Sequence, residues 1–437
     1  MSEHLPTPSM RDRDRHGAPA ATVPSPPTKL PPRSASTPRR GQVVAWALCL
    51  AGLASGRAAP EPAFDPVTIA ADVAIGYGVA VADVDGDRRP DILLADQRQF
   101  VWFRNPGWER FVLAEDLTET DNVCLAAADL DGDGRAEIAV GAGWNPSDTT
   151  DSGAVFYLIA PSDRTQRWTP VRLPHEPTVH RMRWVRNPRD TYDLVVLPLH
   201  GRGNQKGEGA GVRVLAYGRP AGPTSPWPTV LIDDRLHLTH NFDVVPGSQH
   251  SGEDLLVAAR EGVFHFRSEG DRWRREQRIG NDEGKTAFTG AGEVRQGRRR
   301  SGPFIATIEP MHGHQVVVYT PAAADDPSPL WRRTVLDESL IQGHALACGD
   351  LLGLGADQIV VGWRGNRPGD RVGIKLFVSL DDAGAVWKSF PVDENQMACE
   401  DLCLADLDGD GRLDIVASGR ATRNLKVYFN RTAGGGN

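Results

Sequence analysis

The chain has 437 residues, of which 49 are basic and 57 acidic, and its formal net charge is −8 at neutral pH. Residues 1–60 carry eight basic and three acidic side chains, so the rest of the chain carries −8 − 5 = −13. This negative excess repels polyanions, which excludes nucleic acid as an expected partner. The 46 glycines and 33 prolines supply turns, and no stretch shows sustained helical periodicity. The composition therefore indicates an all-β protein.

Residues 1–60 differ in composition from the rest of the chain. Pro, Ser and Arg dominate up to Arg40, and the apolar run 43–53 is followed by small residues at 54–56. The run is too short to span a bilayer, and its flanks are typical of a cleaved signal peptide. We expect a leader at 1–60, export to the periplasm or the extracellular space, and no stable membrane span after cleavage. Arg39 and Arg40 leave open a twin-arginine route or an ordinary basic segment.

A tryptophan recurs along the rest of the chain, and each copy is followed five or six residues later by an aliphatic residue. The tryptophans are Trp108, Trp168, Trp227, Trp273, Trp331 and Trp387, and their aliphatic partners are Leu113, Leu173, Ile232, Ile279, Leu336 and Val392. A period of 46 to 60 residues, built from β-branched and aromatic residues and interrupted by turn residues, predicts a repeated four-stranded sheet.

A second landmark, an acidic loop, gives seven repeats rather than six. The loop has all its carboxylates where it starts at Asp83, Asp129 and Asp406. Degenerate copies, which lack some of them, start at Val185, Asp243, Glu293 and Asp350. The seventh repeat ends with the strand 425–429 and so lacks its outer strand. Residues 64–69, ahead of the first repeat, have the aromatic-to-aliphatic spacing of that strand. We predict a seven-bladed β-propeller of four-stranded antiparallel blades over residues 61–431, whose last blade is closed by the N-terminal strand. Residues 432–437 are expected to form a disordered tail.

The three complete acidic loops place carboxylates at positions 1, 3, 5 and 9 of a tight turn. Gly86, Gly132 and Gly409 permit the backbone bends, and the flanking patterns are those of strands rather than helices. Oxygen ligands at this spacing predict structural calcium in blades one, two and seven. The expected ligands are Asp83, Asp85, Asp87 and Asp91, then Asp129, Asp131, Asp133 and Glu137, and finally Asp406, Asp408, Asp410 and Asp414.

Polar side chains gather on the face opposite these loops, where first strands start and second strands end. Seven of the ten histidines beyond residue 60 fall there, which predicts a pocket at the axial mouth. Imidazole serves as a zinc ligand or a general base, arginine stabilises an oxyanion, and tyrosine donates a proton. The candidate catalytic residues are His240, His314, His344, His180, Tyr77 and Arg364. The candidate substrate-binding residues are Trp144, Asn145, His200, Arg260, Arg420, Glu400 and His312.

These side chains suit β-elimination from a carbohydrate, in which a proton beside a carbonyl or carboxylate is removed and a neighbouring oxygen leaves. Because the mouth residues differ from blade to blade, the pattern favours one asymmetric enzymatic pocket over a multivalent lectin. The alternative is a non-catalytic, calcium-stabilised propeller that binds a glycan or a protein. Four cysteines beyond the leader, Cys124, Cys348, Cys399 and Cys403, match no zinc-binding spacing.

Two family resemblances bear on these expectations. Across 62–431 the acidic loops resemble FG-GAP or VCBS repeats, which implies the propeller fold. The stretches 308–319, 331–336, 343–346 and 397–428 resemble the propeller part of aldos-2-ulose dehydratases. That resemblance implies a carbon–oxygen lyase acting on a keto-sugar, and propeller lyases of uronic-acid glycans are a second comparison. It also implies that zinc or another divalent metal, or else a metal-free base, resides among His240, His314 and His344.

Overall fold

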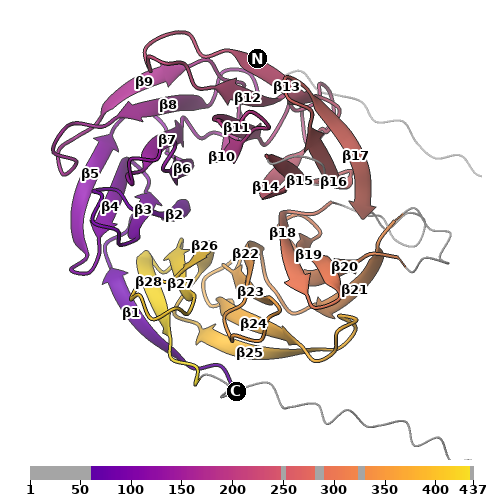
Figure 1. The fold of residues 1–437 in the computed structure, drawn as a ribbon. Helices are drawn as coiled ribbons and strands as arrows, with labels where there is room; N and C mark the ends of the chain where they lie inside the picture. The colour runs from indigo at the N-terminus through magenta and orange to yellow at the C-terminus, as the bar shows by residue number, and fades with distance from the viewer. Residues whose placement is uncertain (1–60, 248–251, 281–289, 323–329, 434–437) are drawn as a thin grey trace, which may run out of the picture. The chain divides into compact units, whose positions relative to one another are not determined.

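The repeating pattern folds into sheets around one axis (Figure 1). The computed structural model describes residues 61–247, 252–280, 290–322 and 330–433, all within one unit of the chain. These residues form 28 strands, paired in seven four-stranded antiparallel sheets. The described ranges contain no helix that is long and apolar enough to cross a membrane. The seven-bladed propeller is therefore confirmed, whereas the expected leader at 1–60 lies outside the described residues.

The blades follow one another in chain order, each running from the axis outward. Blades one to three comprise β2 (Gly78–Ala82), β3 (Asp91–Ala95), β4 (Gln99–Arg104) and β5 (Glu109–Glu115); β6 (Cys124–Ala128), β7 (Glu137–Ala142), β8 (Ala154–Ile159) and β9 (Thr169–Leu173); and β10 (Val179–Arg186), β11 (Tyr192–Pro198), β12 (Val214–Gly218) and β13 (Thr229–Asp233). Blades four and five comprise β14 (Thr239–Pro246), β15 (Glu253–Ala259), β16 (Gly262–Ser268) and β17 (Trp273–Gly280); and β18 (Glu293–Arg299), β19 (Gly302–Glu309), β20 (Gln315–Thr320) and β21 (Arg332–Asp337). Blades six and seven comprise β22 (Gly343–Gly349), β23 (Gln358–Trp363), β24 (Gly373–Ser379) and β25 (Trp387–Glu394); and β26 (Cys399–Ala405), β27 (Asp414–Gly419), β28 (Asn424–Asn430) and β1 (Phe64–Ala70).

The tryptophan repeat marks the junctions between neighbouring blades. Trp168, just before β9, packs into a cluster with Leu113 and Trp102 of the preceding blade. Its main-chain N–H donates to the carbonyl of Leu113 at 2.8 Å, and Trp331 makes the same bond to Ile279 at 3.1 Å. The tryptophan of one repeat thus meets the aliphatic residue of the preceding repeat across the blade boundary. Burial of apolar surface at these boundaries holds the ring together.

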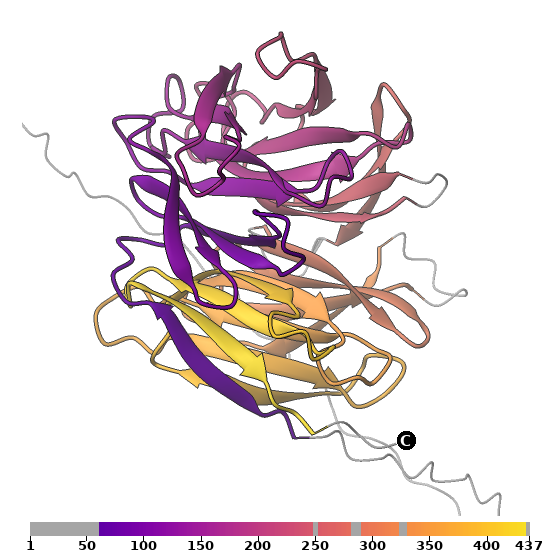
Figure 2. The same ribbon diagram turned by 60° about the vertical axis from the view of Figure 1, so that its left-hand side comes forward.

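Blade seven is closed by the N-terminal strand, as the sequence predicts. β1 pairs antiparallel with β28, from Phe64 opposite Asn430 to Ala70 opposite Leu425, and Figures 1 and 2 show the indigo strand beside the yellow ones. The main-chain N–H of Ala63 donates to the hydroxyl of Thr432 at 3.1 Å, and Thr432 is buried. The fold therefore extends past residue 431, into the segment that the sequence assigns to the tail.

The degenerate loops depart from the register that the repeat predicts. Asp83, Asp129, Asp350 and Asp406 each follow an innermost strand directly. Val185 and Asp243 instead lie inside β10 and β14, and Glu293 begins β18. In these three blades strand therefore occupies the positions that form the start of the loop in blades one, two, six and seven.

Candidate functional site

Four β-bulges shape the centre of the propeller. Pairing between the first and second strands shifts register at His180 on β10, at His240 on β14, at His344 on β22 and at Glu400 on β26. A bulge leaves a residue unpaired and re-aims its side chain. All four side chains are buried, with at most 5% of their surface exposed. Bulges at equivalent places in four blades therefore gather these groups near the axis.

Hydrogen bonds between blades fix the tautomer of each bulge histidine. Nδ1 of His180 lies 2.7 Å from the carbonyl of His240, and Nδ1 of His240 lies 2.9 Å from that of Gly292. Nδ1 of His344 lies 2.6 Å from the carbonyl of Glu400. A carbonyl only accepts, so each Nδ1 carries the proton and each Nε2 keeps its lone pair. These three imidazoles therefore offer Nε2 as a metal ligand or a proton acceptor.

A fourth histidine reaches this group from the turn between β19 and β20. Nε2 of His312 lies 2.7 Å from Nε2 of His240. The ring of His312 lies 4.5 Å from that of His240 and 4.9 Å from that of His344, between centroids. Ring nitrogens of these three residues lie within 4.8 Å of one another. Because Nε2 of His240 has no proton, Nε2 of His312 donates one to it in this structure.

Burial keeps these imidazoles uncharged. It lowers the pKa of His240 to about 3, and the charge of Arg181 adds to the effect. Burial is also the main reason that the pKa values of His180, His312 and His344 lie well below the ordinary value. Neutral imidazoles bind metal but accept a proton weakly, so the electrostatics favour a metal centre over a metal-free base.

The three nitrogens suit a divalent ion of the zinc class. Open catalytic zinc sites use three protein ligands at about 2.0–2.1 Å, and two nitrogens on one tetrahedral zinc lie about 3.3 Å apart. His240 and His312 are closer than that in this structure. Metal binding therefore requires the pair to separate and His312 to move its proton to Nδ1. His312 is the least buried of the three, so it has the most freedom to do so.

A charged cluster adjoins the histidines. The carboxylate of Glu400 accepts from Arg364 at 2.6 Å and from Arg420 at 3.0 Å. Burial would raise the pKa of Glu400, but the two arginines outweigh it and hold the pKa below its ordinary value. The guanidinium of Arg420 lies 5.4 Å from the ring centroid of Tyr77. Burial and the hydrogen bond to Asp121, at 2.7 Å, raise the pKa of Tyr77, which keeps its proton.

An aromatic side chain completes this side of the site. The ring centroid of Trp144 lies 5.0 Å from that of His180. Asp121, which binds the hydroxyl of Tyr77, also accepts the main-chain N–H of Trp144 through its own carbonyl at 2.8 Å. Sequence reasoning missed Asp121 because it precedes β6 without any repeating pattern. It links the tyrosine and the tryptophan of the candidate site.

Three other expected site residues, Asn145, Arg260 and His200, make contacts with neighbouring turns and strands. Asn145 closes a local turn by accepting the N–H of Ser147 at 3.2 Å. Arg260 donates to the carbonyl of Gly207 in the glycine-rich segment at 2.9 Å. His200 makes main-chain bonds with Thr178 and a bridge to Leu238.

The structure places His312 where the sequence analysis expected His314. Gly313 donates its N–H to the carbonyl of Met311 at 2.7 Å within the turn. Nε2 of His312 contacts Nε2 of His240, whereas His314 is not part of the group of ring nitrogens. Only one histidine of a His-Gly-His turn reaches the axis, and the sequence alone does not distinguish them.

The acidic loops lie at the other end of the innermost strands. Groups of three carboxylates are formed by Asp83, Asp85 and Asp91, by Asp129, Asp131 and Glu137, and by Asp406, Asp408 and Asp414. The position-5 residues Asp87, Asp133 and Asp410 stand outside these groups. Burial, reinforced by the neighbouring carboxylates, raises the pKa of Asp91 to about 7 and that of Asp414 to about 6. This electrostatic crowding favours a bound cation.

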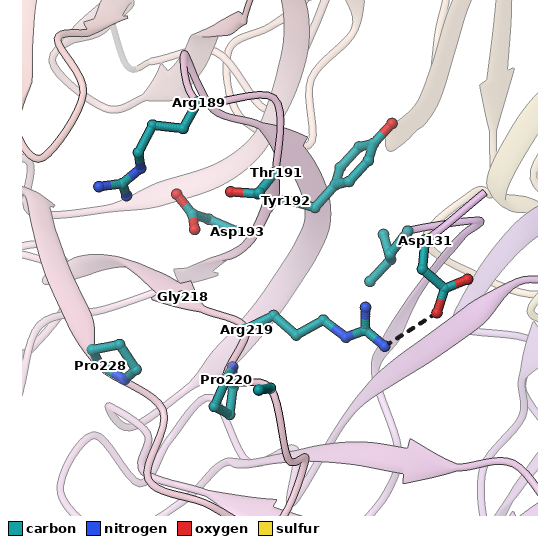
Figure 3. A pocket seen from close by; sticks show the side chains of 11 residues that line it. Asp131, Arg189, Thr191, Tyr192, Asp193, Gly218, Arg219, Pro220 and Pro228 are labelled. Carbon is teal, nitrogen blue, oxygen red and sulfur yellow. Dashed lines mark ion pairs between the residues drawn. The ribbon is translucent and has the colours of Figure 1, made fainter.

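A cleft borders the second acidic loop rather than the axis. It has a volume of about 560 Å³ and lies between blades two and three (Figure 3). Asp131 and Arg219 form an ion pair at 3.7 Å on its wall, and Tyr192, Asp193 and Arg189 line its other side. No histidine lines it. The cleft is therefore a surface groove without imidazole ligands, and it is separate from the axial cluster.

Protonation of the buried imidazoles is expected to make the metal-free protein acid-labile. Their folded-state pKa values are lowered, so below the ordinary value of about 6.5 the unfolded chain binds protons that the folded chain does not. The free energy of unfolding then decreases as the pH is lowered, by up to about 1.4 kcal/mol per pH unit for each imidazole, until the folded-state pKa is reached.

Urea unfolding of chelator-treated protein at about pH 7.5 and about pH 5.5 measures this loss. In His344→Gln the loss is expected to be smaller by roughly 1 kcal/mol or more. His314→Gln is the control, because that side chain is exposed in the folded chain. An equal loss in wild type and His344→Gln contradicts the assignment.

Comparisons with known proteins place this geometry in context. Residues 152–322 match the propeller domain described as "Aldos-2-ulose dehydratase, beta-propeller domain". Residues 64–140 match an FG-GAP-like repeat and residues 125–158 an FG-GAP repeat. The dehydratase match contains His180, His240 and His312. It overlaps the expected resemblance at 308–319 and reaches further toward the N-terminus, whereas the stretches 331–336, 343–346 and 397–428 lie outside it.

One curated relative is aldos-2-ulose dehydratase of Phanerodontia chrysosporium, which is 28% identical over 253 residues. The match covers 52% of this chain and 28% of that protein, less than a third of its length. Among solved structures, a chain of the BBS1N–ARL6DN complex gives a TM-score of 0.52 at 15% identity, covering 86% of this chain and 99% of that one. Kuenenia stuttgartiensis hydrazine synthase gives 0.51 at 11% identity, covering 83% and 97%. These two likenesses show the fold alone. The chain is thus a seven-bladed propeller with segments that match FG-GAP repeats and the aldos-2-ulose dehydratase propeller domain, and it is distantly related to that dehydratase.

Proposed function

We propose that this chain catalyses β-elimination on a sugar at the axial cluster, with His240, His312 and His344 holding a divalent metal of the zinc class. The observation that carries the proposal is the convergence of three neutral imidazoles on the axis. The distant relation to a carbohydrate-acting dehydratase supports a sugar as the substrate. A bound metal would polarise the carbonyl or carboxylate of the sugar.

The remaining side chains supply the other parts of an elimination. His180 is the axial imidazole outside the proposed metal set, and its Nε2 is free of a proton because its Nδ1 is fixed by the carbonyl of His240. It is a weak base by itself, but a bound metal would make the proton beside the carbonyl more acidic, which would let His180 accept it. Arg364 and Arg420 supply positive charge for the oxyanion that develops. Tyr77 retains its proton and can pass it to the departing oxygen as the carbon–carbon double bond forms. Trp144 offers an aromatic face beside His180 for the sugar ring.

Metal content and turnover test this proposal together. Purified wild-type chain is expected to contain close to one zinc-class ion, measured by mass spectrometry, in addition to any calcium. His312→Ala and His344→Ala are expected to lose it, whereas the matched variant His314→Ala keeps it. Wild type is also expected to form a conjugated product from a keto-sugar or a uronic-acid glycan, followed by ultraviolet absorbance.

Each outcome of this test is informative. A drop in activity of at least about 100-fold in His312→Ala, with little change in His314→Ala, is expected if the metal polarises the substrate. Absence of the metal from wild type, or equal retention in His312→Ala, contradicts the metal centre. Metal binding without turnover of any sugar favours a binding propeller.

We also infer that calcium occupies the three acidic loops and stabilises the fold. The loop at Asp350 offers an internal comparison, because Asp350 accepts two main-chain N–H groups at 2.8 and 2.7 Å much as Asp129 does at 2.8 and 3.0 Å. It has Leu352 and Gln358 where the second loop has Asp131 and Glu137. The turn thus forms without the acidic group, so those added carboxylates are best explained by a cation.

Calcium removal is expected to lower the melting temperature. A site with calcium at 100 times its Kd contributes about 2.7 kcal/mol, measured by calorimetry with EDTA and after calcium is restored. Asp129→Asn is expected to reduce the calcium-dependent increment, and Asp350→Asn to leave it unchanged. No response of the wild-type melting temperature to EDTA and calcium is the contrary result.

Export is proposed from the leader at 1–60. The described cysteines, Cys124, Cys348, Cys399 and Cys403, are all free thiols, so no disulfide among them supports export. Expression of the full chain, cell fractionation and sequencing of the N-terminus test the proposal. An intact N-terminus in the cytoplasmic fraction contradicts it.

A further inference from the structure

Arg181 is a buried arginine with unused hydrogen-bond donors. It is 5% exposed and follows the bulge residue His180 on β10. Its Nη1 donates to the carbonyl of His180 at 3.3 Å, whereas Nε and Nη2 have no hydrogen-bond partner within the described part of the chain. Buried charged donors are normally satisfied, so an unsatisfied pair points to a ligand that the protein alone does not supply.

The guanidinium lies where the blades converge. Burial is the main influence on the pKa values of His240, His344, Glu293 and Asp401, and the charge of Arg181 favours the deprotonated form of all four. These residues belong to β14, β22, β18 and β26, the innermost strands of four other blades. A single charge acts on all of them because it lies close to the axis, beside the histidine cluster.

The carboxylates around Arg181 are already engaged. Glu293 accepts from Asn241 at 2.7 Å and contacts Nδ1 of His240 at 3.1 Å. The oxygens of Asp401 accept the N–H groups of Leu402 and Val79, both at 3.0 Å. Glu400 is held by its two arginines. Among the described residues, no carboxylate forms an ion pair with Arg181 at contact distance, so its Nε–Nη2 edge is left without a partner.

The unused donors form the edge of guanidinium that binds carboxylates. Nε–H and one N–H of Nη2 run parallel along one side of the planar group, which matches the two oxygens of a carboxylate. Arg183, two residues further on β10, uses the same edge within the protein. Its Nε donates to the carbonyl of Phe242 at 3.2 Å and its Nη2 to the side chain of Asn241 at 3.3 Å. The two arginines thus differ in whether this edge is occupied.

We propose that the axial site takes a sugar that bears a carboxylate, of the uronic-acid class, and that the Nε–Nη2 edge of Arg181 binds this carboxylate. The proposal rests on the β-elimination proposed above and narrows its substrate class. Both nitrogens are covered by protein in the ligand-free structure, so binding displaces neighbouring side chains. In a uronate the proton beside the carboxylate passes to the base, a double bond forms to the next carbon, and the C–O electron pair leaves with the oxygen. Pairing with Arg181 offsets the negative charge that builds up on the carboxylate.

Thermal unfolding with a matched pair of sugars tests the proposal. D-Glucuronate is expected to raise the melting temperature of the full chain, and D-glucose at the same concentration is not. In Arg181→Met the response to D-glucuronate is expected to disappear. The sugar-free melting temperature of this variant is expected to stay close to that of wild type, because Nε and Nη2 of Arg181 have no hydrogen bonds to lose.

Arg183→Met is the matched control, since it removes from the same strand a partly buried guanidinium whose Nε and Nη2 are both hydrogen-bonded. It is expected to lower the melting temperature and to keep the response to D-glucuronate. If Arg181→Met does not fold, Arg181→Lys keeps the charge without the two-donor edge and is expected to weaken D-glucuronate binding about tenfold or more. No response in wild type, an equal response to D-glucose, or a full response in the Arg181 variants overturns the proposal.

The outcome is separable from that of the proposed function. Metal at the histidines and turnover of a neutral keto-sugar, without any response to D-glucuronate, would leave the elimination standing and remove the carboxylate site. A response that depends on Arg181, without turnover of any sugar, would establish the carboxylate site and remove the elimination.

Discussion

The centre of this propeller depends on hydrogen bonds from imidazole Nδ1 atoms to main-chain carbonyls of the next blade. Such a bond joins blade three to four at His180, blade four to five at His240, and blade six to seven at His344. Each one ties adjacent innermost strands together and also sets which ring nitrogen carries the proton. Stability and ligand chemistry therefore rest on the same contacts, and the bulges that direct them are part of the site rather than irregularities of the sheet.

Two chemically different ends follow from this arrangement. The innermost strands of blades three, four and six begin at histidine bulges, whereas those of blades one, two and seven end at acidic loops. Imidazole suits zinc-class ions, whereas carboxylates in a tight turn suit calcium. Around the histidines, Arg181, Arg364 and Arg420 face buried carboxylates of which Glu400 is the most heavily bonded. A buried guanidinium edge without a partner, as in Arg181, is better matched to an anionic sugar than to a neutral one.

Much of the fold is readable from the sequence, because it follows from a repeat. Trp168 and Leu113 belong to neighbouring copies of the repeat that predicts the blades, and they bond across a blade junction. The N-terminal strand at 64–70 has the pattern of the missing fourth strand and fills that place. The alignment of the acidic loop is wrong in blades three to five. Val185 and Asp243, which it places at the start of a loop, lie inside β10 and β14.

The site is less readable, because it depends on local turns and on departures from strand pairing. His240, His344 and Glu400 are predicted from their place at strand starts, but the bulges that turn them inward leave no pattern in one sequence. The choice between His312 and His314 is made by the turn around Gly313. Arg181 has a signal in the sequence that was not used above. Arginines at 181 and 183 alternate with apolar residues in a strand that is mostly buried. Only the partners of its nitrogens, which tertiary structure determines, separate it from Arg183.

The most direct test of the account is a crystal structure of the chain grown with zinc and calcium, with anomalous difference maps recorded on both sides of the zinc absorption edge. The account predicts a zinc peak on the propeller axis among the imidazole nitrogens of His240, His312 and His344, with calcium confined to the acidic loops. A map with no zinc on the axis, and with the rings of His240 and His312 still bonded to each other, would contradict it.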